Sequence, residues 1–419
     1  MGRYARDKSL QNPKPVERIE LEEKNVGVRI AIVAVLILIA VISFGYGISQ
    51  WLSVDSGWTV IEANSDAKMN VSNEFVLMYE LGTREDMTIV AENKGIRALY
   101  TEVMEDSYEI FHNNVEVKGV NNLYYLNRHV NQEVQVDEML YEAFELLAKH
   151  ENRALYLAPI YEQYNNLFAC EDDAQTKDFD PYVNETLAAE FKVISDFAKD
   201  ASAIQVELLG NNTVKLYVSD AYLAYANEHG ITSFVDFGWM KNAFIVDYLS
   251  EKLLEEGYKS ATISSYDGFS RNLDASGTEF SYNIYDYEAG NVIQAAKISY
   301  ANAQSIVSMH SFPINTLDAY RYYVYDNGEI LSSYLSVADG LAKNAANSVY
   351  VSSDKYSCSE IMLSVQDLYL TDSLDLNAWS ALKFADMQAI IVNEKTIFYN
   401  NESIKLSDVY TAYKTEEIN

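Results

Sequence analysis

The stretch from Val235 to Leu273 constrains the fold more than any other part of the chain. A turn at 236–238 leads into an amphipathic helix. The apolar face of this helix is predicted to be Phe244, Val246, Leu249, Leu253 and Leu254. Gly257 follows the last helical residue, where a helix end often requires a positive φ. The run 261–263 then predicts a buried strand, and Asp267-Gly268 a turn beyond it. Such glycine turns can present backbone N–H groups to a phosphate, but they also serve as ordinary scaffolding.

A run without charged residues, from Ile30 to Ile48, predicts a single transmembrane helix. At about 1.5 Å per residue, it nearly spans a hydrocarbon core of roughly 30 Å. Trp51 follows at the depth of an interfacial anchor, and basic residues dominate the preceding flank. These features predict a cytoplasmic N-terminus and an extracytoplasmic body in the cell membrane. A cleaved signal peptide is the alternative, although the run is long and lacks a clear small-residue cleavage site.

The remaining patterns predict one α+β domain with a mostly antiparallel sheet and packed helices. Hairpin signatures surround Gly210, Gly290 and Asn393, and helical patterns cover residues 137–147 and 187–201. Residues 121–127 are predicted to be a loop. The predicted organisation is a disordered tail (1–29), a transmembrane anchor (30–50), a stalk (51–73), the domain (74–400) and a C-terminal tail (401–419).

Composition excludes some functions and leaves others open. The net charge of -31 argues against nucleic-acid binding, because such a surface repels phosphate backbones. The 33 tyrosines fit either the wetter face of a sheet or a carbohydrate- or partner-binding surface. Cys170 and Cys358 are compatible with a disulfide, but their spacing does not require one. The five histidines show no metal-ligand spacing.

The central stretch resembles the core of the ApbE family, the FAD:protein FMN transferases. The family carries Asp-Leu-Gly-Gly-Ile-Ala-Lys-Gly-Tyr-Ala-Val-Asp, then a helix, then Asn-Leu-Gly-Gly-Asn-Ile-Arg. The matching residues are Asp236, Gly238, Val246 and Asp247 in the first block and Gly268 and Arg271 in the second. Trp239 replaces the second glycine of the first block, and Asp267 replaces the first glycine of the second. The resemblance covers roughly residues 75–400 and implies an ApbE-like, T-fold-related domain.

The resemblance also implies a chemistry and a set of site residues. The family splits FAD at its pyrophosphate and transfers FMN to a threonine or serine of a partner protein, with a divalent cation such as Mg²⁺. Glu360 and Ser364 fit the positions of the family's metal-binding aspartate and threonine, and the backbone carbonyl of Lys241 fits the third ligand. The implied cofactor-binding residues are Asp236, Gly238, Asp267, Gly268, Arg271, Ser333 and Gly340.

Departures from the family motifs predict lost or altered flavin chemistry. Ser333 stands where the family has a histidine, and of that motif only Gly340 is retained. Asp267 and Asp339 stand where the family has neutral residues. At an effective dielectric near 20, a like charge about 4 Å away costs about 4 kcal/mol, which disfavours an anionic pyrophosphate. We therefore expect a pocket refilled with bulk and negative charge, in which FAD and Mg²⁺ binding is weak or lost.

Three hypotheses follow from the sequence. The first is a membrane-anchored, extracytoplasmic pseudoenzyme that acts as a binding or assembly component in flavoprotein maturation, together with a protein partner. The second is an active Mg²⁺-dependent FMN transferase that uses Glu360 and Ser364. The third is a cell-surface protein that binds carbohydrate or a partner through tyrosine-rich strands.

Overall fold

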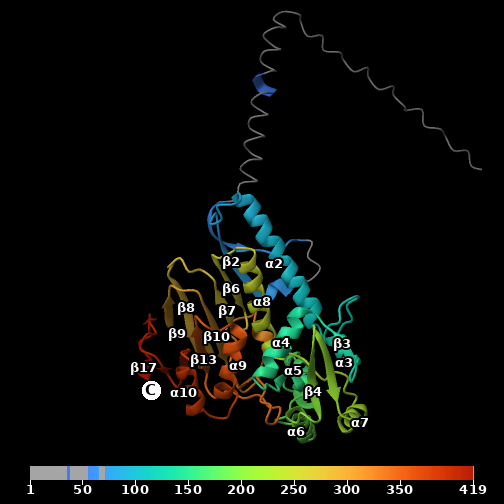
Figure 1. Ribbon diagram of the computed structural model, residues 1–419. Coiled ribbons are helices and arrows are strands. Elements are labelled where there is room, and N and C mark those ends of the chain that lie inside the picture. The colour runs from blue at the N-terminus through green and yellow to red at the C-terminus, as the bar shows by residue number, and fades with distance from the viewer. Residues whose placement is uncertain (1–34, 38–54, 66–70, 419) are drawn as a thin grey trace, which may run out of the picture. The chain divides into compact units, whose positions relative to one another are not determined.

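The computed structural model describes residues 35–37, 55–65 and 71–418 (Figure 1). The chain divides into two units, residues 1–54 and 55–419, and the elements below belong to the second. The predicted tail and most of the predicted transmembrane segment lie outside the described residues. Within the described ranges, no helix combines the length and the apolar character that crossing a bilayer requires.

A nine-stranded sheet forms the centre of the domain, and its strand order is β1-β2-β6-β7-β10-β13-β14-β15-β17. The strands are β1 (Gly57–Ile61), β2 (Phe75–Leu81), β6 (Ala261–Ser265), β7 (Phe269–Asn272), β10 (Gln304–His310), β13 (Ser348–Ser353), β14 (Gln388–Asn393), β15 (Thr396–Tyr399) and β17 (Lys414–Glu417). All neighbours pair antiparallel except β15 and β17, which pair parallel. The mostly antiparallel α+β architecture predicted from the sequence is thus confirmed.

Three smaller sheets flank the main one. They are β16-β9-β8, with β8 (Phe280–Glu288), β9 (Asn291–Tyr300) and β16 (Leu406–Ser407); β3-β5-β4, with β3 (Glu133–Gln135), β4 (Ile204–Gly210) and β5 (Thr213–Val218); and β11-β12, with β11 (Tyr322–Val324) and β12 (Ile330–Ser332). The predicted hairpins around Gly210, Gly290 and Asn393 are all present, as β4-β5, β8-β9 and β14-β15.

The helices pack around the sheets (Figure 1). They are α2 (Ile89–Phe111), α3 (Leu123–Arg128), α4 (Glu138–Lys149), α5 (Ala158–Phe168), α6 (Glu185–Lys199), α7 (Asp220–His229), α8 (Lys241–Glu255), α9 (Cys358–Tyr369) and α10 (Leu376–Phe384). Short 3-10 turns are η1 (Val71–Glu74), η2 (Ala154–Leu157), η3 (Thr176–Asp178), η4 (Gly238–Met240) and η5 (Ala319–Arg321).

Helix α8 is the predicted central helix, and it packs on β6 and β7 between α2 and α9. Gly257 follows it with φ +84°, as its place after the helix predicts. Phe244, Val246, Leu249 and Leu253 are buried as predicted, but Leu254 is 43% exposed. The prediction for Leu254 is wrong because consecutive helical residues point about 100° apart, so Leu254 turns away from the face that buries Leu253.

The structure differs from the sequence predictions at both ends of the domain and at one loop. Residues 57–61, in the predicted stalk, form β1, and residues 414–417, in the predicted C-terminal tail, form β17. The predicted loop at 121–127 contains α3, whose first turn is capped by the Asn122 side chain accepting from Tyr125 N. Cys170 and Cys358 are both free thiols, and Cys358 is buried.

Candidate functional site

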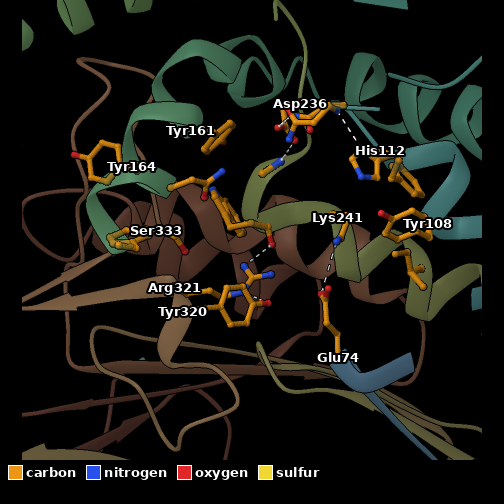
Figure 2. A pocket seen from close by; sticks show the side chains of 18 of the residues that line it. Glu74, Tyr108, His112, Tyr161, Tyr164, Asp236, Lys241, Tyr320, Arg321 and Ser333 are labelled. Atoms are coloured by element: carbon orange, nitrogen blue, oxygen red, sulfur yellow. Dashed lines mark hydrogen bonds and ion pairs between the residues drawn. The ribbon is translucent and has the colours of Figure 1, made fainter. Parts of the chain in front are cut away.

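A cavity of about 670 Å³ opens beside the turn that leads into α8. This volume lies in the range typical of small-molecule sites. Its lining comes from the end of α2 and the following loop, from α5, from the 236–241 turn and from η5 (Figure 2). The residues are Glu74, Ser107, Tyr108, Phe111, His112, Asn113, Asn114, Tyr161, Tyr164, Asn165, Phe168, Asp236, Gly238, Trp239, Lys241, Ile245, Tyr320, Arg321 and Ser333. The sequence predicts a pocket filled by bulk, and Trp239, the residue that supplies this bulk, lines the cavity without closing it.

The 236–241 turn is fixed by Asp236 and Gly238. Asp236 Oδ1 accepts from Gly238 N at 2.8 Å, and its Oδ2 accepts from the Asn113 side-chain amide. Gly238 has φ +52°, and a Cβ there would lie 2.7 Å from the Tyr161 ring. Only glycine fits this close approach without moving Tyr161. The next residue, Trp239, is buried and packs edge-on against Tyr334.

A buried ion pair joins the cavity wall to the β6-β7 turn. Arg321 Nη2 lies 2.5 Å from Asp267 Oδ2, and both side chains are more than nine-tenths buried. Arg321 Nε also donates to Tyr320 Oη at 3.0 Å. Asn242 Nδ2 donates to Asp267 Oδ2 at 3.0 Å and to Glu74 Oε2 at 2.9 Å, so the pair is also tied to η1, just before β2.

The acidic residues predicted to repel an anion are both paired. Arg321 neutralises Asp267, and Lys343 lies 3.0 Å from Asp339. The sequence argument is wrong on this point because it treated each carboxylate as an isolated charge. Arg321 was missed as a site residue, since the local pattern around it indicates only a tyrosine-rich strand.

Several titratable groups of the cavity have shifted pKa values, and two of them are His112, at the end of α2, and Asp236, in the 236–241 turn. Burial lowers the pKa of His112, and nearby Lys241 adds to this effect. His112 Nδ1 accepts from the backbone N–H groups of Asn114 and Val115 at 3.1 and 3.2 Å, which suits the neutral ring. Burial raises the pKa of Asp236, against the opposing effects of the Gly238 N–H, Lys241 and the Asn113 amide.

The cavity gathers only part of the predicted cofactor set. Asp236, Gly238 and Ser333 line it, together with Lys241 from the predicted metal set. Asp267 does not line the cavity, but it forms an ion pair with Arg321, which does.

The other predicted cofactor residues do not line the cavity and have structural contacts instead. A Cβ on Gly268 would lie 2.0 Å from Ser308 O on β10, so this glycine permits the turn to pack against the neighbouring strand. Arg271 donates to Ser305 Oγ at 2.6 Å. A Cβ on Gly340 would lie 2.4 Å from Ile160 Cδ1.

Two of the predicted metal ligands make hydrogen bonds within α9. Glu360 Oε2 accepts from Ser357 N at 3.0 Å in a capping box at the start of α9, and Ser364 Oγ donates to Glu360 O at 2.9 Å. Glu360 lines a separate hollow of about 290 Å³, together with Asp247 and Glu251, whereas Lys241 lines the larger cavity. In the part of the chain that the structure describes, no three His, Cys, Asp or Glu side chains are grouped to hold a metal ion. This donor arrangement does not fit Mg²⁺.

A neutral residue of α9 reaches the turn instead. Gln366 Nε2 contacts Met240 Sδ at 3.5 Å, and Gln366 Oε1 accepts from Asn152 Nδ2 at 2.5 Å. The motif alignment points to Glu360 and Ser364, and Gln366 lies about 200° around the helix from Ser364, so the 360/364 spacing does not lead to it. At this contact α9 therefore supplies an amide and no carboxylate.

Comparison with known proteins gives a structural likeness only. No family model and no curated protein sequence matches the chain. The ApbE protein of Thermotoga maritima superposes with a TM-score of 0.53 at 13% identity, covering 86% of this chain and 100% of that one. The flavin transferase ApbE of Vibrio cholerae gives 0.54 at 12% identity with the same coverage. The apo flavinyl transferase ApbE of Pseudomonas stutzeri gives 0.50 at 10% identity, covering 85% and 97%. The likeness confirms the resemblance seen in the sequence motifs, and over most of its length this chain carries the ApbE fold.

Proposed function

We propose that this chain uses the ApbE fold as a binding or assembly component and does not transfer FMN. One observation carries the proposal: Glu360 and Ser364 contact their own helix end, whereas α9 meets the Met240 turn through the neutral Gln366. Transfer of a phosphoryl-linked group depends on a divalent cation that neutralises charge on the phosphate oxygens. A site that lacks hard anionic ligands at this place does not hold such an ion.

The charges around the cavity support the same proposal. The cavity is lined by one lysine and one arginine, and each forms an ion pair with a carboxylate. Lys241 lies 3.7 Å from Glu74, and Arg321 lies 2.5 Å from Asp267. A pyrophosphate would have to compete with these carboxylates for each cation. Because a buried charge left without its partner is costly, this competition weakens anion binding.

The proposed location is the outer face of a cell membrane, with the N-terminus in the cytoplasm. The support is the charge-free run at 30–48 and the basic residues before it. The proposed partner is an extracytoplasmic protein of flavoprotein maturation, which follows from the ApbE-like fold alone.

The test is an attempt at flavin transfer with the full-length chain in detergent. The chain is incubated with FAD, Mg²⁺ and a peptide carrying the family's threonine acceptor, and the peptide mass is measured. We expect no phosphoester adduct with FMN and no release of AMP. The Vibrio cholerae transferase serves as the positive control.

A second test is calorimetric titration with FAD, with and without Mg²⁺. It should give a dissociation constant weaker than about 100 µM, or a binding free energy less favourable than about -5.5 kcal/mol. An adduct, or a submicromolar constant that requires Mg²⁺, would show the proposal to be wrong.

An active transferase is the second candidate, and the open cavity favours it. Asp236, Gly238 and Lys241, which match or replace residues of the family's first motif, all line this space. If an adduct forms, Glu360→Ala should abolish it on this second hypothesis, whereas Glu251→Ala in the same small hollow should not.

A further inference from the structure

Aromatic rings make up much of the cavity wall. They come from the end of α2, from α5, from the 236–241 turn and from η5 (Figure 2). The rings used in the argument are Tyr108, Tyr161, Tyr164, Trp239 and Tyr320. The face of an aromatic ring carries negative electrostatic potential and attracts cations, most strongly where water is excluded.

The charged side chains at the cavity leave one carboxylate without a cation. Lys241 pairs with Glu74, and Arg321 pairs with Asp267. Asp236 forms no ion pair with any residue that the structure describes, and both of its oxygens accept from neutral N–H groups, of Gly238 and Asn113. Figure 2 places it at the opposite end of the cavity from Glu74.

The groups that face Asp236 do not supply the missing charge. His112, from the end of α2, is held in its neutral form by two backbone N–H donors. Tyr161 and Glu162, from α5, are an uncharged phenol and a further carboxylate that acts on Asp236 through space. Lys241, from α8, acts on Asp236 through space, but its ion pair is with Glu74.

We propose that this cavity binds an organic ammonium ion, with Asp236 as counter-charge and the aromatic rings as its cage. The inference rests on the proposed binding function, since it uses the same cavity, and it assigns the ligand a charge opposite to that of a pyrophosphate. A bare metal ion does not fit, because a single carboxylate among aromatic rings lacks the oxygen ligands that metal ions require. The net charge of -31 also concentrates cations around the molecule.

The experiment compares choline with its uncharged isostere 3,3-dimethyl-1-butanol by calorimetric titration of the full-length chain. The two probes share their shape and differ in charge. We expect choline to bind at least tenfold more tightly than the isostere. Equal affinities, or no choline binding at about 10 mM, would overturn the proposal.

Two variants assign the binding to this cavity. Asp236→Asn keeps an acceptor for Gly238 N and removes the charge, so it should weaken choline at least tenfold and leave the isostere unchanged. Tyr108→Leu, at a half-buried ring that lines the cavity beside His112, should weaken choline several-fold, whereas Tyr108→Phe should retain it. Glu251→Gln, in the separate hollow, is the control and should change neither probe. If Asp236→Asn does not fold, the Tyr108 pair still decides the question, and equal choline affinity in all variants would contradict the inference.

The two proposals fail separately. An FMN adduct on the acceptor peptide overturns the proposed function, whatever choline does. The absence of both the adduct and choline binding overturns only the ammonium site.

Discussion

At the scale of single residues, the pair of Arg321 and Asp267 decides how the cavity wall is charged. Asp267 replaces a family glycine, and its charge is accommodated because η5 brings Arg321 to 2.5 Å from it. Removing one partner of a buried pair leaves the other charge uncompensated, which costs more than the pair itself contributes.

Asp267→Asn should therefore lower the free energy of unfolding by about 3 kcal/mol. The measurement is urea denaturation followed by fluorescence. Asp86→Asn breaks the ion pair with Arg84, in which Asp86 is 62% exposed, and should leave the denaturation midpoint nearly unchanged. Equal effects of the two substitutions would contradict a stabilising role for the buried pair.

The residues of the site differ in how far the sequence could predict them. Asp236 and Gly238 were predictable because their contacts are local: the carboxylate accepts from an N–H group two residues away. Arg321 and Gln366 were not, because their partners lie far along the chain and only the folded topology joins them. The assignment of Glu360 and Ser364 as metal ligands stays a prediction from the family motif, because a capping box and a metal motif both use oxygen side chains near a helix start.

At the scale of elements, the turn between β6 and β7 shows why one family glycine persists. Gly268 has φ +103°, and the backbone of β10 runs directly against it, with Ser308 N donating to Gly268 O at 2.8 Å. A side chain there meets a backbone oxygen that cannot move without disturbing the central sheet.

Gly268→Ala should destabilise the protein by several times as much as Gly290→Ala. Gly290 has φ +84° in the β8-β9 turn, with no atom near its missing Cβ, so its substitution adds only the backbone strain of about 1–2 kcal/mol. Thermal unfolding of the two variants measures the difference, which isolates the clash with Ser308. Similar melting temperatures would mean that β10 yields easily at this point.

Most elements were predictable because they carry strong local patterns. The α8 helix and the three hairpins have apolar periodicity and turn residues that agree with the final fold. The strand β17 was missed because Lys414–Glu417 holds no apolar residue to signal burial. The strand β1, Gly57–Ile61, carries apolar residues but falls between the predicted anchor and the domain, in the stretch assigned to a stalk. Such strands owe their conformation to the edge of the sheet that they join.

At the scale of the whole molecule, acid stability depends on a histidine in the central sheet. His310 on β10 is 3% exposed, and its Nε2 lies 2.9 Å from Tyr350 Oη on β13. Burial lowers the pKa of His310 to about 3. The folded state therefore needs the neutral ring, so stability is full above the unfolded pKa of about 6.5 and is lost as the pH falls toward 3.

His310→Gln should remove this acid dependence. Between pH 7 and pH 4.5, the wild type should lose about 3 kcal/mol more of its unfolding free energy than the variant. Buried carboxyls such as Asp247, whose pKa burial raises, act in the opposite direction, but they are common to both proteins and cancel in the comparison. Urea denaturation at the two pH values gives the result, with the exposed His150→Gln as control. Parallel pH profiles of wild type and His310→Gln would contradict the assignment.

The parallel strand β17 has a practical consequence for anyone who shortens this chain. Tyr413, just before it, is buried in the cluster beneath the β8-β9 hairpin and donates to Asp286 Oδ2 at 2.8 Å. Trimming at residue 400 would strip β15 of its neighbour and uncover that cluster at the same time. Bare strand edges beside apolar surface recruit other chains, so the last residues decide whether a trimmed protein stays in solution.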